Sequence, residues 1–106
     1  MLVRTNMAIQ EISVEEAKEL LRKNAGNAKF VVIDVRTAEE YEEKHLPNAV
    51  HLDSYSPTFE EELAKLDREK TYLLHCQTGS RSRHATYLME EMGFPQVYNV
   101  KGILLL

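Results

Sequence analysis

The sequence predicts a single α/β domain with a mainly parallel sheet and helices on both faces of that sheet. Short runs of β-branched and apolar residues alternate along the chain with helical segments that are amphipathic or charged. Two of these runs, residues 30–35 and 71–76, are apolar at almost every position, which suits strands that are covered on both faces. A chain of 106 residues fits one domain. We expect this domain to span residues 9–106, with residues 1–8 as an N-terminal extension in which Met7 is an alternative start.

The alternation is regular enough to place each element. The expected strands are, in chain order, residues 9–12, 30–35, 49–52, 71–76 and 96–100. The expected helices lie between them, at residues 14–23, 37–45, 57–67 and 82–92. Three helices begin with a capping-box pattern, in which Glu follows a Ser or Thr by three residues: Ser13 with Glu16, Thr37 with Glu40, and Thr58 with Glu61. Gly26 and Gly93 are typical of helix ends.

Composition and charge exclude several functional classes. A net charge of −4 disfavours electrostatic binding of nucleic acid. No apolar run approaches the roughly 18 residues that a membrane span needs, and the N-terminus lacks the apolar core of a signal peptide. The single cysteine excludes an internal disulfide and a zinc site built from several cysteines. We therefore expect a reducing, cytoplasmic setting, with neither nucleic acid nor a membrane as partner.

Cys76 is the candidate catalytic residue because of the segment that follows it. The cysteine ends a buried strand, and Gln77–Arg81 loops toward a helix that we expect to begin near Ser82. Unpaired amides at a helix start carry partial positive charge, and Gly79 allows the loop to turn further amides toward the thiol. Arg81 adds a formal charge. These features predict a depressed thiol pKa and an anion-binding loop, although they leave the anion open. The alternative is a buried cysteine that only packs.

Three segments of the sequence resemble one known family. They are HCQTGSRS around Cys76, VVIDVRTAEEYEEKHLPNAVHL at residues 31–52, and VYNVKGI at residues 97–103. Together, and in this order, they resemble the single-domain rhodaneses, which are sulfurtransferases. The resemblance covers nearly the whole chain and implies a three-layer fold, in which a sheet of five parallel strands is flanked by helices.

The same resemblance implies an activity. Cys76 would take a sulfane sulfur from a donor such as thiosulfate and pass it to cyanide or a thiol, and a protein could also be the acceptor. The cysteine persulfide would lie in a loop formed by Gln77, Thr78, Gly79, Ser80 and Arg81, with Arg81 binding the anionic donor. No metal and no organic cofactor is implied. The expected function is thus a sulfurtransferase of the thiosulfate type, and the alternative is a rhodanese-like binding or regulatory module without catalysis.

The length of the loop bears on whether the anion is phosphate. Cysteine-dependent phosphatases resemble the pattern HC-x5-R, in which the arginine lies six positions after the cysteine. Here Ser82 occupies that position, and Arg81 lies one residue closer to Cys76. By resemblance, the tighter loop suits a persulfide. A small phosphatase or arsenate reductase is the third alternative.

Two secondary site residues lie at the end of the strand expected at residues 30–35. Asp34 and Arg36 match the DVR segment of the family, which would place Arg36 near the active-site mouth, where it would hold the loop or the donor. The alternative is a structural ion pair between the two. His75 alternates to the opposite face from Cys76 and is expected to pack in the core. Arg83 is expected to contact solvent or an acidic side chain.

The chain departs from the family in two places. Lys44 and Asn48 stand where the family carries glycine, and Asn48 tolerates the positive φ that such a turn requires. After Gly102 the family continues through a helix, whereas this sequence ends in ILLL. We expect the C-terminal helix to be truncated. Residues Ile103–Leu106 would then pack on the domain's own core or on a neighbouring chain, which would allow self-association.

Overall fold

The computed structural model describes residues 9–105, so the expected extension at residues 1–8 and the last residue, Leu106, lie outside the described residues. The strands are β1 (Ile9–Ile12), β2 (Phe30–Asp34), β3 (Val50–His51), β4 (Thr71–His75) and β5 (Val97–Val100). The helices are α1 (Val14–Lys23), α2 (Ala38–Glu43), α3 (Phe59–Ala64) and α4 (Ser80–Glu91). The five strands form one sheet in the order β1-β5-β4-β2-β3, and all neighbours pair in parallel. The predicted fold class is therefore confirmed.

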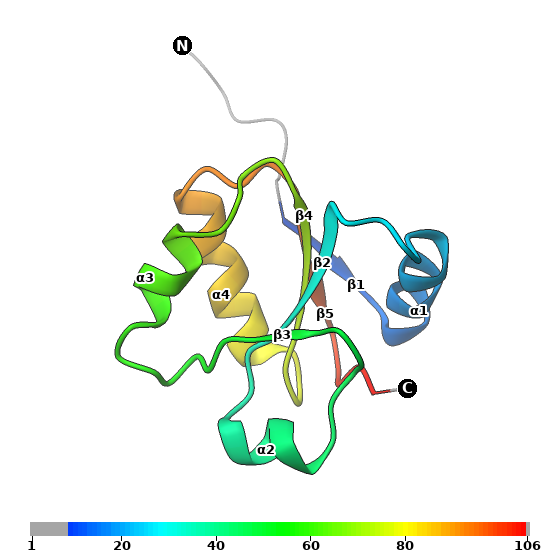
Figure 1. Ribbon diagram of the computed structural model, residues 1–106, viewed down its shortest axis with the longest axis horizontal. Coiled ribbons are helices and arrows are strands. Elements are labelled where there is room, and N and C mark those ends of the chain that lie inside the picture. Colours follow the sequence, from blue (N-terminus) through cyan, green and yellow to red (C-terminus); the bar gives the residue numbers. More distant parts are fainter. Residues whose placement is uncertain (1–8, 106) are drawn as a thin grey trace.

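Helices cover both faces of the sheet, with α1 on one side and α3 and α4 on the other (Figure 1). Successive residues of β4 belong to the two sides in turn, as the period of a strand requires. Tyr72 and Leu74 lie in the core beneath α3 and α4, together with Cys76, whereas Leu73 lies in the core on the α1 side. His75 also faces the α1 side and is completely buried, as its alternation with Cys76 predicts.

Two of the three predicted capping boxes are present. The side chains of Ser13 and Glu16 cap α1 reciprocally, and those of Thr37 and Glu40 do the same for α2. The prediction for Thr58 is wrong, since its hydroxyl makes no capping bond to the backbone of α3. Thr58 has φ −103° and ψ 12°, which is not the extended conformation that a side-chain cap needs, and its Oγ1 donates to the Glu62 carboxylate at 2.6 Å instead.

Three helices also differ from their predicted lengths. Helix α2 ends at Glu43, two residues before the predicted end at residue 45. Helix α3 ends at Ala64, three residues before the predicted end at residue 67. Helix α4 begins at Ser80, two residues before the predicted start at Ser82. The earlier start follows from Gly79, which is the N-cap of α4 with a left-handed φ of 101° and so turns the chain abruptly into the helix. The loop after Cys76 is therefore shorter than the pattern predicts.

The chain after β5 forms no further helix within residues 9–105, and it packs on the α1 side of the sheet. Leu104 is completely buried there, and its amide donates to His75 Nδ1 at 3.3 Å. Ile103 and Leu105 are half-buried. Packing of this segment on the domain's own core is thus confirmed for Leu104, while self-association through it stays a prediction.

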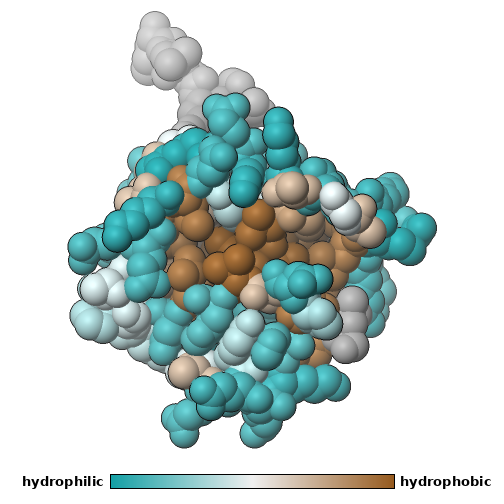
Figure 2. Space-filling model, viewed as in Figure 1, coloured by the Kyte–Doolittle hydropathy of each residue, from teal (hydrophilic) through white to brown (hydrophobic). Residues whose placement is uncertain are grey.

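An apolar surface lies away from the Cys76 loop, where β2 begins. Strand β3 pairs only with Ile33 and Asp34, so the first half of β2 has a strand partner on one side only. A hollow of about 420 Å³ borders this edge and is lined by residues that include Leu21, Phe30, Val31, Leu46 and Val50. Figure 2 shows apolar side chains gathered in the middle of this view of the molecule, with hydrophilic side chains around them.

Candidate active site

Cys76 follows β4, the central strand, at the carboxyl edge of the sheet. Ligands of open α/β sheets bind at this edge, because the loops that leave the strands meet there. The helix α4 starts only four residues later, so its first turn lies beside the thiol. The side chain of Cys76 packs on the core beneath α3 and α4 and has no exposed surface.

Three hydrogen-bond donors point at the sulfur. The Gly79 amide lies 3.1 Å from Cys76 Sγ, the Ser82 amide 3.4 Å and the Ser82 hydroxyl 3.5 Å. Burial is the largest single influence and raises the pKa of the Cys76 thiol, but the bonds from Ser82, Gly79 and the Thr78 amide together outweigh it. The net result is a pKa of Cys76 below its ordinary value, as the loop predicts, so the site favours a thiolate.

Gly79 fixes the shape of the loop for two separate reasons. Its φ of 101° is one that side chains with a Cβ rarely adopt. A Cβ at this position would also lie 3.2 Å from Lys101 Cα and 3.2 Å from the Val100 carbonyl oxygen. The loop is therefore packed directly on the backbone that leaves β5, which leaves no room for a side chain and holds the Gly79 amide toward the sulfur.

Ser82 and Asn99 are the site residues that sequence reasoning missed. The Ser82 hydroxyl has one hydrogen, which Cys76 Sγ and Asn99 Oδ1 share as acceptors, and Asn99 Nδ2 donates to the Gly79 carbonyl at 3.2 Å. Both residues are completely buried. Ser82 lies three residues after Gly79, and this helical spacing was the available signal for it. Asn99 comes from β5, and nothing in the local pattern indicates its role.

The side chains of the other loop residues lie outside the group of donors around the sulfur. The side chains of Gln77, Thr78 and Ser80 are exposed, and the hydroxyls of Thr78 and Ser80 lie 3.3 Å apart. Arg81 turns toward α2, where its Nη1 and Nη2 donate to the two carboxylate oxygens of Glu40 at 2.9 and 3.1 Å. The guanidinium carbon also lies 5.6 Å from the centre of the Tyr55 ring.

Asp34 and Arg36 form a buried ion pair at the end of β2. Arg36 Nε lies 3.0 and 3.1 Å from the two oxygens of Asp34, and its Nη2 lies 2.8 Å from Oδ2. The remaining contact of Nη2 is with the Lys44 carbonyl at 2.7 Å. Burial raises the pKa of Asp34, but the bonds from Arg36 outweigh it and hold that pKa below its ordinary value. The geometry is that of the structural ion pair that the sequence left as an alternative.

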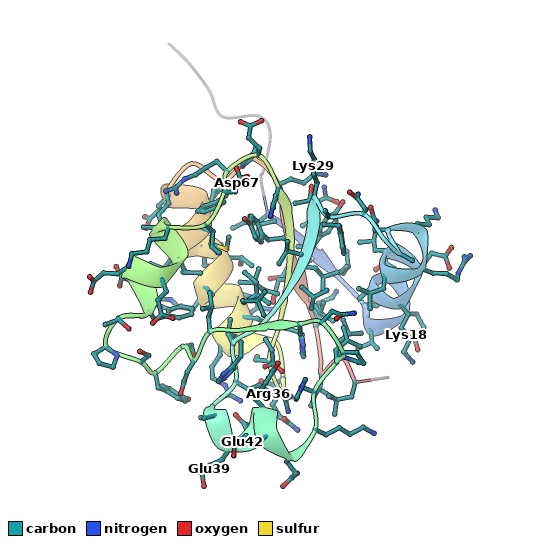
Figure 3. The ribbon with its side chains drawn as sticks, viewed as in Figure 1. Lys18, Lys29, Arg36, Glu39, Glu42 and Asp67 are labelled. Carbon is teal, nitrogen blue, oxygen red and sulfur yellow. The ribbon has the colours of Figure 1, made fainter. Side chains whose placement is uncertain are left out.

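Arg36 also borders a hollow at the edge of the loop. The hollow measures about 390 Å³ and is lined by Arg36, Glu39, Glu40, Glu43, Lys44, Gln77, Ile103 and Leu105. Figure 3 shows Arg36 between the strand ends and α2, with Glu39 on the outer side of that helix.

Arg83 forms an ion pair with Glu11, in which Arg83 Nε lies 2.6 Å from Glu11 Oε2. The predicted contact of Arg83 with an acidic side chain is therefore present.

Two further findings concern the described part of the chain. Among residues 9–105, no three His, Cys, Asp or Glu side chains lie together as a metal site would require. None of the helices in that range is long and apolar enough to cross a membrane.

Known proteins resemble this chain in both sequence and structure. The family model of the rhodanese-like domain matches residues 13–103. A protein of Coxiella burnetii (strain RSA 331) named thiosulfate sulfurtransferase GlpE is 36% identical over 96 residues, which cover 91% of this chain and 84% of the relative. The GlpE protein of Pseudomonas savastanoi is 33% identical over 93 residues, covering 88% and 81%. A solved rhodanese-like domain protein from Staphylococcus aureus superposes with a TM-score of 0.73 at 27% identity, covering 88% of this chain and 85% of that one.

Proposed function

Since this chain belongs to the rhodanese-like domain family, we propose that it is a sulfurtransferase in which Cys76 carries the sulfur. The observation that carries the proposal is the set of donors around Cys76 Sγ, which comes from Gly79 and Ser82. Donors of this kind stabilise a sulfur anion and do nothing comparable for a neutral thiol. They would stabilise the Cys76 thiolate that begins the reaction.

The proposed reaction has two displacement steps. The Cys76 thiolate attacks the sulfane sulfur of thiosulfate, a bond forms between the two sulfur atoms, and the sulfur–sulfur bond of thiosulfate breaks. Sulfite leaves with the bonding electron pair, and the enzyme holds a persulfide anion. Cyanide or a thiolate then attacks the outer sulfur, and the Cys76 thiolate is released together with thiocyanate or a new persulfide. Neither step consumes a proton, so no separate general base is needed.

The residues of the loop would have distinct tasks in this sequence. Gly79 and Ser82 hold the sulfur anion, and Arg81 binds the sulfonate end of the donor through its guanidinium. A low-molecular-weight thiol or a protein cysteine would accept the sulfur in place of cyanide. A lone catalytic thiol also suits the cytoplasm, where thiols stay reduced.

One observation favours a second candidate, a rhodanese-like binding module without turnover. Cys76 has no exposed surface, so a donor can reach the sulfur only after neighbouring atoms move. A module that binds a partner through its surface would need no such movement, and the fold alone does not distinguish the two.

The test is sulfur loading of the intact protein. Incubation with thiosulfate should add one sulfur atom to Cys76, detected by mass spectrometry, and cyanide should then remove it as thiocyanate. Cys76→Ser should abolish both results, because serine cannot form a persulfide. A wild-type protein that takes up no sulfur under conditions in which it is folded would refute the catalytic proposal and leave the binding module.

A further inference from the structure

The guanidinium of Arg81 is already bound by a carboxylate in the ligand-free protein. Its two terminal nitrogens meet the two oxygens of Glu40, a residue 41 positions earlier in the sequence. The pair is partly shielded from solvent, with 20% of the Arg81 side chain and 32% of the Glu40 side chain exposed. This bidentate geometry is the same one that a guanidinium offers to a sulfonate or phosphate.

Glu40 is held in place for this contact by its own helix. Its Oε1 accepts from the Thr37 amide at 2.9 Å as part of the capping box of α2. The bonds from Arg81 and then from Thr37 lower the pKa of Glu40 to about 2, so the residue is a carboxylate throughout the neutral range. The acidic group is therefore a fixed and permanent partner of Arg81.

Arg81 is also close to the reactive sulfur. It directly precedes Ser82, whose amide and hydroxyl contact Cys76. A negative charge on Cys76 adds to the effect of Glu40 in raising the pKa of Arg81. The guanidinium therefore pairs with Glu40 and also interacts electrostatically with a charge on Cys76, the residue that the proposed donor anion must reach. Glu40 occupies the fork formed by Nη1 and Nη2, so a second anion cannot bind through that fork at the same time.

We infer that Glu40 competes with the donor anion for Arg81 and so determines how strongly the site binds anionic sulfur donors. This inference rests on the proposed function, because it assigns Arg81 to the donor. Thiosulfate must displace the Glu40 carboxylate before it gains the Nη1/Nη2 fork of the guanidinium. An uncharged donor, such as an organic trisulfide, has no use for the guanidinium and leaves the pair intact. Glu40 is thus a specificity-determining residue that weakens selection for anionic donors over neutral ones.

A binding experiment tests this without any turnover. Sulfate is added to the Cys76→Ser protein, with and without Glu40→Gln, and binding is followed through the Arg Nε–Hε signals in NMR spectra. Glutamine keeps the oxygen that caps α2 but loses the charge, so sulfate should bind about three- to tenfold more tightly. Glu40→Asp, whose carboxylate is one methylene shorter, should change the affinity in the same direction.

Glu11→Gln is the matched control for this experiment. Glu11 of β1 makes a similar two-point contact with Arg83, which lies on α4 two residues after Arg81. Breaking that pair should leave sulfate affinity unchanged, and Arg81→Met should remove the gain that Glu40→Gln produces. Equal sulfate affinities for Glu40→Gln and its Cys76→Ser parent, with both folded, would overturn the inference.

Kinetics separate this inference from the proposed function. In Glu40→Gln the KM for thiosulfate should fall by a factor similar to that seen for sulfate, while kcat stays within about twofold, since the sulfur and its donors are untouched. The rate of sulfur transfer from diallyl trisulfide should be the same in Glu40→Gln and in the wild type. If sulfur loads onto Cys76 and KM for thiosulfate is the same in both proteins, the inference fails while the proposed function stands. If no sulfur loads, the proposed function fails and the sulfate affinities still decide the role of Glu40.

Discussion

The strands β2 and β4 are neighbours in the sheet and end at the same edge, yet the chain leaves them in two different ways. Asp34 and His75 lie side by side in the register of the two strands. At the end of β2, the Asp34 carboxylate and the Arg36 guanidinium form an ion pair in the interior. Past His75, the hydrogen-bond donors around the Cys76 sulfur are backbone amides and a hydroxyl, all of them uncharged groups. At the end of β2 both charges are already paired. At the end of β4 the donors are fully used only when Cys76 is ionised to a thiolate. Stability should therefore depend on the end of β2, and reactivity on the end of β4.

The largest expected contrast comes from substituting one residue at each end. Arg36→Met leaves the Asp34 carboxylate buried without a partner, so the free energy of unfolding should fall by about 3–5 kcal/mol. Cys76→Ser changes one atom and should alter stability by about 1 kcal/mol or less while abolishing sulfur loading. Urea unfolding measures the first effect and mass spectrometry the second.

The double variant Asp34→Asn/Arg36→Met is the control for the β2 end. It removes both charges and should recover part of the loss. Similar stability losses for Arg36→Met and Cys76→Ser would contradict the division between the two ends.

A smaller effect is expected from Ser82→Ala, which removes one donor to the sulfur. The pKa of Cys76 should rise, because the hydroxyl no longer stabilises the thiolate, and alkylation by iodoacetamide near pH 7 should slow by about three- to tenfold. The rate measured against pH should converge with that of the wild type in alkaline solution, where both thiols are ionised.

Ser80→Ala is the matched control, since that hydroxyl also lies in the first turn of α4 but is exposed and forms its hydrogen bond with Thr78. An unchanged pH profile in Ser82→Ala would mean that the hydroxyl serves Asn99 alone.

The smallest effect should appear in the pH dependence of stability. Burial, the largest cause, lowers the pKa of His75 below its ordinary value of 6.5. The unfolded chain then binds the proton more readily than the folded one, so the free energy of unfolding should fall as the pH drops below about 6.5. For this single proton the slope is at most about 1.4 kcal/mol per pH unit. The contribution of Asp34, whose pKa is lowered, is present at neutral pH and is lost only below its ordinary value of 3.8.

Urea unfolding between pH 7 and pH 5 measures this slope. His75→Gln should reduce it, and the surface variant His84→Gln is the control. Equal slopes in the wild type and His75→Gln would show that His75 is not the residue that links folding to pH in this range.

The sequence predicted most of what depends on local pattern. Strand order along the chain, the opposite orientations of His75 and Cys76, and the capping of α1 and α2 all follow from spacings of two to four residues. The positive φ of Asn48, 69° in the structure, was predictable for the same reason. Thr58 carries the same capping signal but fails, because its backbone is not extended and its hydroxyl donates to the Glu62 carboxylate.

The unpredicted parts of the site depend on contacts between distant segments. Asn99 reaches Ser82 across 17 positions, and Glu40 reaches Arg81 across 41. Neither pairing corresponds to a helical or strand spacing that could be recognised in the sequence. The nearness of β5 to the loop, which explains why position 79 must be glycine, likewise becomes visible only once the sheet is assembled.

The packing of Gly79 on the end of β5 has a practical consequence for engineering. Because main-chain atoms shape the pocket around the sulfur, the exposed side chains at Gln77, Thr78 and Ser80 are not required for that shape. These three positions form a compact target for a randomised library. For the sulfurtransferase proposed above, selection from such a library should change the preferred sulfur acceptor while Cys76 and its hydrogen-bond donors stay unchanged.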